Sequence, residues 1–252
     1  MGKPENLREI LKDETSVQLA LEMMSKRRIL AISPHPDDSE IIAGGFLAGA
    51  VIRNASIKLV VVSDGRKGST TTADEEELVK IRKDEQMRAC EVLGIREVEF
   101  LGYIDSEIPE PRSIRSYIMN EIRKHRADLV ITTDPTLEYE AHLDHVHVGR
   151  AVMESVLLLS HQSIGKGKVY PGRPALALGA PGHPNLVLDV AGTFETKMNA
   201  ISCHESQLQD IAYVREGVLK VSRRYGSIIG AEHGEPFTLL HGEDLHMNVP
   251  LP

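Results

Sequence analysis

Four short apolar runs, each followed by a stretch with helical spacing, constrain the fold of this chain more than any other feature. The runs are RILAIS (28–33), IKLVVVS (57–63), EVEFLG (97–102) and ADLVITT (127–133). They are continuously apolar rather than alternating in polarity, which is typical of parallel strands covered on both faces. The stretches between them have the length of the helical crossovers that join parallel strands. The sequence therefore predicts an α/β protein with a Rossmann-like layered fold, in which helices flank a mainly parallel sheet.

The second half of the chain gives a weaker signal. PALALGA (174–180) and NLVLDV (185–190) predict two further strands, and helical spacing recurs over 193–208 and 212–226. These segments extend the expected sheet and its helical layers.

No repeat and no linker-like composition interrupts the chain, and a length of 252 residues suits one α/β domain. We expect a single domain over 1–252. Within it we expect an N-terminal helical extension over 1–27 and a C-terminal tail over 235–252.

Composition and missing motifs exclude several classes of function. A net charge of −8 disfavours nucleic-acid binding, which needs clustered Lys and Arg to neutralise phosphates. No long apolar run predicts a membrane span, and the polar N-terminus lacks a signal peptide, so a cytoplasmic location is expected by default. Two isolated cysteines offer neither a disulfide framework nor a thiolate zinc site. Dinucleotide, P-loop and serine-hydrolase signatures are absent from the sequence.

Polar side chains gather in the loops after the four predicted strands. The loops read PHPDDSE, DGRKGST, YIDSEIPE and DPTLEYEAHLDHVH, and each is rich in carboxylates or histidines. In parallel α/β sheets, ligands bind outside the carboxyl ends of the strands. The sequence therefore places its polar chemistry on one rim of the sheet.

Two of these loops carry pairs of metal-ligand residues with the same spacing. His35 and Asp38 are three residues apart, and so are His142 and His145. Either motif alone would be read as a turn or as a helix cap made by Asp38 or Ser39. Together at one rim, two histidines and one carboxylate are a recurring catalytic zinc set with an open position for water. Zinc lowers the pKa of a bound water to about 7 and polarises a carbonyl, so the pattern predicts a hydrolase.

The neighbours of these residues suggest further roles. Asp37 points in a different direction from the adjacent Asp38, so it is expected to lie within reach of the reacting water as a general base. Of the second histidine pair, one member would bind the metal and the other would donate to the developing oxyanion. Asp144 would hydrogen-bond to one of the imidazoles and orient it without binding the metal itself. His147 is expected to be turned away from the metal on the following helix.

SPHPDDSEIIAGG (33–45) and EAHLDHVHVG (140–149) resemble the PIG-L/LmbE family of zinc-dependent de-N-acetylases. Weaker blocks extend the resemblance over nearly all of 28–246. Within the family, TTDPTLEYEAHLDH and the histidine-containing C-terminal tail are most similar to diacetylchitobiose deacetylases. One departure is visible, because Leu143 stands where the family usually has proline.

The resemblance implies a catalytic centre with one Zn²⁺ per chain. Its implied zinc ligands are His35, Asp38 and His145. It further implies that Asp37 is the base that activates the water. His142 matches the histidine that assists the tetrahedral intermediate, and Asp144 matches the orienting partner of that histidine.

The resemblance also implies contacts with substrate and with other subunits. Arg82 and Asp105 match positions that contact sugar hydroxyls. His246 resembles a tail histidine that reaches the site of a neighbouring subunit. Related enzymes are often trimers or hexamers, so a homo-oligomer is expected.

These observations lead to one main hypothesis and several rivals. The main hypothesis is zinc-dependent hydrolysis of the N-acetyl group of an N-acetylglucosamine-containing small molecule, similar to diacetylchitobiose. The first rival is deacetylation of a glucosaminyl conjugate in mycothiol or bacillithiol synthesis. The others are a metal-dependent phosphoesterase, for which two metals per chain are common, and a non-catalytic binding module.

Overall fold

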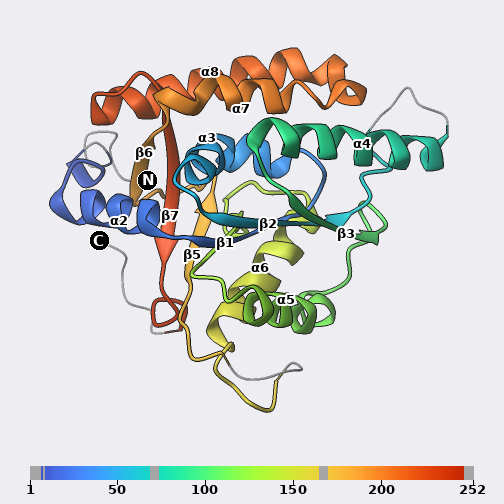
Figure 1. The fold of residues 1–252 in the computed structure, drawn as a ribbon, viewed down its shortest axis with the longest axis horizontal. Coiled ribbons are helices and arrows are strands. Elements are labelled where there is room, and N and C mark those ends of the chain that lie inside the picture. Colours follow the sequence, from blue (N-terminus) through green and yellow to red (C-terminus); the bar gives the residue numbers. More distant parts are fainter. Residues whose placement is uncertain (1–6, 8, 69–73, 165–169, 247–252) are drawn as a thin grey trace.

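The computed structural model describes residues 7, 9–68, 74–164 and 170–246 (Figure 1). Its strands are β1 (Arg28–Ser33), β2 (Ser56–Ser63), β3 (Glu97–Tyr103), β4 (Leu129–Thr133), β5 (Ala175–Gly179), β6 (Leu186–Asp189) and β7 (Gly234–Leu240). In the described part of the chain, seven strands form one sheet in the order β3-β2-β1-β4-β5-β7-β6. Every pairing from β3 to β5 is parallel, whereas β7 is antiparallel to both of its neighbours. The predicted α/β fold with a mainly parallel sheet is confirmed.

Helices cover both faces of this sheet. They are α2 (Glu14–Ser25), α3 (Asp38–Ile52), α4 (Glu75–Leu93), α5 (Pro111–His125), α6 (Leu143–Leu157), α7 (Phe194–Ile201) and α8 (Leu208–Ile229). Figure 1 shows α3, α4, α7 and α8 on one face and α5 and α6 on the other. The helix expected over 193–208 ends at Ile201 and is followed by a short 3-10 turn over Glu205–Gln207. No helix within the described ranges combines the length and apolarity needed to cross a bilayer.

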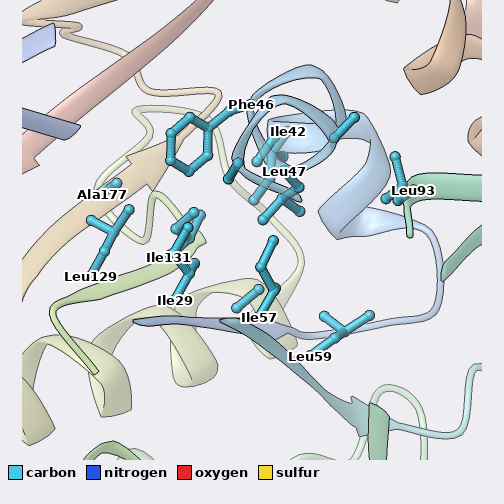
Figure 2. Close-up of a cluster of buried hydrophobic side chains, with 14 of the residues drawn as sticks. Ile29, Ile42, Phe46, Leu47, Ile57, Leu59, Leu93, Leu129, Ile131 and Ala177 are labelled. Atoms are coloured by element: carbon cyan, nitrogen blue, oxygen red, sulfur yellow. The ribbon is translucent and has the colours of Figure 1, made fainter. Parts of the chain in front are cut away.

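The two buried faces explain why the strand sequences are continuously apolar. Along β1, Ile29 and Ala31 enter the core cluster under α3, whereas Leu30 and Ile32 enter the cluster under α5 and α6. Figure 2 shows Ile29 in the first cluster, near side chains of α3 such as Leu47. Successive strand residues point to opposite faces, so a strand covered on both sides needs apolar residues at every position.

The expected C-terminal tail over 235–252 is wrong for its first six residues. Residues 235–240 belong to β7, which lies between β5 and β6 and is buried along its whole length. This strand was not predicted from the sequence because Glu235 and Pro236 interrupt its apolar pattern. Glu235 is accommodated because Lys197 donates to its carboxylate at 2.7 Å. Pro236 is accommodated because the pairing with β5 begins only at Phe237.

The strand order also places the candidate site. β1 lies between β2 and β4, so the chain leaves β1 toward one edge of the sheet and later returns to its other side. Such a reversal opens a crevice at the carboxyl ends of the two central strands, where doubly wound sheets bind ligands. The loops that follow β1 and β4 border this crevice.

Candidate metal centre and active site

Three side chains from the two loops converge on one point. The Nδ1 atom of His35 lies 3.2 Å from Nε2 of His145 and 3.3 Å from Oδ2 of Asp38. The Nε2 atom of His145 is 3.4 Å from Oδ1 of Asp38. These atoms face one another in a buried setting, with His35 and Asp38 only 7% and 8% exposed. Two imidazole nitrogens and a carboxylate in this arrangement fit a divalent metal such as zinc.

The electrostatics of this cluster agree with a cation site. Burial opposes the charged form of His35, but hydrogen bonds to Asp105, Asp144 and Asp38 outweigh it and raise the pKa to about 12. Burial likewise opposes ionisation of Asp38, but His145 and His35 hold the pKa of this carboxyl well below its usual range. The cluster therefore keeps positive charge at the point where the two nitrogens meet.

The second ring nitrogen of His35 contacts two carboxylates that are not among the three candidate ligands. Its Nε2 atom lies 3.1 Å from Oδ2 of Asp144 and 3.3 Å from Oδ1 of Asp105. Asp144 is fixed in turn by the backbone N–H groups of Ser106 and Ile108. Such outer contacts select the tautomer of a ligating histidine and orient its ring.

Asp37 lies beside the cluster, and its side chain is partly exposed. It contributes to a pocket of about 220 Å³ whose lining includes Asp37, Lys67, Arg82, Asp105, Ser106 and His142. Nη2 of Arg82 donates to Oδ2 of Asp37 at 3.1 Å. Burial raises the pKa of Asp37 to about 7, although Arg82 acts in the opposite direction. A carboxyl with this pKa can accept a proton near neutral pH.

His142 also lines the pocket and is the N-cap of α6. The centroid of its ring is 4.5 Å from that of His35 and 5.2 Å from that of His145. Burial and the two neighbouring histidines lower the pKa of His142. An acidic group and an imidazole thus line one small pocket next to a candidate metal site.

Comparisons with known proteins identify the family of this chain. The family described as "PIG-L: GlcNAc-PI de-N-acetylase" matches residues 30–156. A diacetylchitobiose deacetylase of Thermococcus kodakarensis is 30% identical over 229 residues, which cover 88% of this chain and 86% of that protein. The chain belongs to the PIG-L family.

Two further relatives extend the comparison within the PIG-L family. The solved structure of N,N'-diacetylchitobiose deacetylase from Pyrococcus horikoshii has a TM-score of 0.86 and 28% identity, and the match covers 98% of this chain and 96% of that one. A probable N-acetyl-alpha-D-glucosaminyl L-malate deacetylase 2 of Bacillus cereus is 28% identical over 193 residues, covering 73% of this chain and 85% of that protein.

Asp144, which the resemblance assigns to His142, makes a side-chain hydrogen-bonding contact with His35. Its carboxylate also lies within 4.8 Å of a ring nitrogen of His142. His142 precedes the first turn of α6, whereas Asp144 lies within that turn and faces the loop that holds Ser106 and Ile108.

Sequence reasoning missed Glu140, which contacts both histidines of the second motif. Its Oε2 atom lies 3.1 Å from Nδ1 of His145, and its Oε1 atom accepts the backbone N–H of His142 at 2.8 Å. The segment also contains Glu138 and Asp144, and spacing alone gave no reason to choose among three carboxylates. Glu140 gives His145 an outer partner of the kind that His35 has in Asp144.

The remaining expected site residues lie at different distances from the cluster. Arg82 and Asp105 are each 3% exposed and line the pocket. His246 lies in an exposed turn beyond β7 and is not part of that lining. His147 contacts the carbonyl oxygen of Ile108. Among the described residues it belongs to neither group that could hold a metal, which are His35, Asp38 and His145, and His35, Asp105, His142 and Asp144.

Leu143 does not distort the loop, although the PIG-L family usually has proline there. Leu143 is the first residue of α6, a position at which proline is favoured. His142 has φ −79° and ψ 105°, the extended conformation that a following proline requires. The backbone therefore adopts without proline the conformation that proline would impose.

Proposed function

We propose that this protein is a zinc-dependent hydrolase that removes the N-acetyl group from an N-acetylglucosamine-containing substrate similar to diacetylchitobiose. The convergence of His35, Asp38 and His145 next to Asp37 is the observation that carries the proposal. The diacetylchitobiose deacetylases among its relatives support this choice of substrate. The products would be acetate and a free amine.

In this proposal His35, Asp38 and His145 hold the metal, one per chain. When bound, zinc supplies a Lewis acid that polarises the amide carbonyl and makes a water molecule more acidic.

The proton transfers belong to the chain's own side chains. Asp37 takes a proton from the water as its oxygen forms a bond to the acetyl carbon, and Arg82 holds the Asp37 carboxylate in place. His142 donates a hydrogen bond to the oxygen on which negative charge develops. Asp37 then returns the proton to the nitrogen as the C–N bond breaks, so that the amine leaves neutral.

A second candidate substrate is an N-acetylglucosaminyl malate. The similarity to the probable malate deacetylase of Bacillus cereus, which covers 73% of the present chain, favours this alternative. Both candidates share the N-acetylated sugar and differ in the group attached to it.

Acetate release by the zinc-loaded protein tests the proposal directly. The panel is N-acetylglucosamine, diacetylchitobiose and N-acetylglucosaminyl malate, each with and without chelator. Release from diacetylchitobiose that stops on chelation supports the proposed substrate, and release from the malate conjugate alone favours the second candidate. No release from any of the three by protein with bound zinc would contradict the proposed activity.

We also propose that the protein is a homo-oligomer, a trimer or hexamer, and that His246 acts at the site of a neighbouring subunit. The exposed position of His246, outside the pocket of its own chain, supports this proposal. Light scattering tests the oligomeric state, and a single-chain mass would contradict it.

A further inference from the structure

Asp37 has an unusual backbone for the residue that begins a helix. It is the N-cap of α3, with φ 103° and ψ −27°, and its side chain makes no capping hydrogen bond. An aspartate at this position usually has an extended backbone, and its carboxylate accepts an N–H of the first helical turn. The left-handed region costs free energy for any residue with a side chain, so other contacts must hold Asp37 there.

A different side chain makes the capping hydrogen bond to the first turn of α3. Ser33, the last residue of β1, accepts the N–H of Ser39 through its Oγ atom at 3.2 Å. The same hydroxyl donates to the carbonyl oxygen of His35 at 2.8 Å. Ser39 is the second residue of α3, and its N–H is one that an aspartate N-cap would hold. The carboxylate of Asp37 is therefore free to face the pocket.

Gln86 holds the backbone of Asp37 from α4, which lies beside α3 on the same face of the sheet (Figure 1). Its Oε1 atom accepts the N–H of Asp37 at 2.9 Å. Its Nε2 atom donates to Oε1 of Glu40 at 2.7 Å. Gln86 and Glu40 are both fully buried, at 0% exposure.

Glu40 determines which end of the Gln86 amide meets Asp37. The second oxygen of Glu40 accepts the hydroxyl of Ser39 at 3.0 Å, so both oxygens act as acceptors. An acceptor at this place requires the NH₂ group of Gln86 to face Glu40. The amide oxygen then faces the N–H of Asp37, and the reverse orientation would bring two donors together.

We propose that Gln86, oriented by Glu40, is a positioning residue that holds Asp37 in its left-handed conformation and so directs its carboxylate into the pocket. The catalytic consequence rests on the proposed function, in which Asp37 is the base. The conformational consequence does not rest on it. Without Gln86, Asp37 would relax to the extended backbone and cap α3 like an ordinary N-terminal aspartate.

The first test compares turnover in three variants and one control. Q86L removes the acceptor for Asp37 and is expected to lower kcat by about 10- to 100-fold with little change in KM or in bound zinc. Q86E places two carboxyl groups against each other and is expected to be impaired as well. The exchange variant Q86E/E40Q restores an amide–carboxylate pair with an acceptor still facing Asp37, so it should recover most of the kcat lost in Q86E.

S206A is the matched control for these variants. The hydroxyl of Ser206 donates to Glu85 on the same buried polar face of α4, but it does not contact Asp37. The kcat of S206A is expected to stay close to that of the wild type. An unchanged kcat in Q86L, or an exchange variant no more active than Q86E, would overturn the proposal.

The second test is crystallographic and does not depend on activity. The wild type should show a positive φ at Asp37, and Q86L should show an extended Asp37 whose carboxylate accepts an N–H of α3. A left-handed Asp37 in Q86L would overturn the proposal even if kcat falls. If the wild type releases no acetate from any substrate of the panel, the proposed function fails, and the conformation of Asp37 in Q86L still decides the role of Gln86.

Discussion

The two loops that border the proposed metal centre are built differently. The loop after β1 reaches α3 within four residues, which are buried apart from the half-buried Asp37. The loop after β4 runs over 134–142 before α6 begins, and Tyr139 in it is 85% exposed. Each loop leads into a helix whose first turn carries a candidate metal ligand, Asp38 in α3 and His145 in α6, but the first loop is the more buried of the two.

This difference suggests a division of labour. The buried loop carries His35 and Asp37 and leads into Asp38 at the start of α3, and Gln86 and Arg82 of α4 contact Asp37. The exposed loop ends at His142 and leads into His145 in the first turn of α6, and Glu140 of this loop contacts both histidines. We therefore expect substitution of Asp37 to reduce turnover while zinc is retained, and substitution of Glu140 to weaken zinc binding.

The largest effect is expected for D37N in the buried loop. Asparagine keeps the size of the side chain but cannot accept the proton of the water, so kcat should fall by about 10²- to 10⁴-fold. Bound zinc should be unchanged, because Asp37 is not a ligand. Acetate release and metal content measured on the same sample check both statements. Near-normal turnover by D37N would show that another group is the base.

The exposed loop is tested by comparing E140A with E140Q. Loss of the carboxylate removes the outer partner of His145, so E140A should bind zinc about 10- to 100-fold more weakly. Glutamine can still accept from the ring and from the N–H of His142, so E140Q should lose less. Competition with a chromogenic chelator measures both affinities. Equal affinity in E140A and the wild type would mean that the loop does not depend on Glu140.

The pH dependence of zinc binding sharpens the contrast between the two ligand histidines. In the metal-free protein the pKa of His35 is raised to about 12, so the ring keeps its proton at neutral pH, and zinc must displace it. Release of one proton makes zinc bind about tenfold more tightly for each unit of rising pH. His145 also has a raised pKa and adds to the release at lower pH. Calorimetry in buffers of different ionisation heat counts these protons, and no release at neutral pH would refute the charged state of His35.

The smallest effect is expected for L143P at the start of α6. The conformation of His142 already suits a following proline, so the substitution should raise the free energy of unfolding by about 0.4–1 kcal/mol. Turnover should stay near that of the wild type. L143A is the matched control, because it removes the exposed leucine side chain without adding the ring. Thermal or denaturant unfolding measures the difference, and destabilisation of L143P alone would show that the loop departs from the backbone described here.

The features predicted from the sequence are those that depend on local pattern. The continuous apolar runs located the central strands, and the loop motifs located the pairs of candidate ligands that the structure brings together. The contacts of Gln86 were not predictable, because they link residues 49 positions apart and depend on how α3 packs against α4. β7 was missed for a related reason, since the buried Glu235 is satisfied by Lys197 and by the backbone N–H groups of Gly45 and Phe46, all distant in sequence.

The central claim is that a single metal in the cluster of His35, Asp38 and His145 supports deacetylation. The most direct test is to titrate metal-free protein with zinc while acetate release from diacetylchitobiose is measured. We predict no acetate release without metal, and a rate of release that rises with added zinc and levels off at one zinc per chain. Full activity without metal, or a rise that continues to two zinc ions per chain, would contradict it, and the second result would favour a two-metal site of the phosphoesterase type.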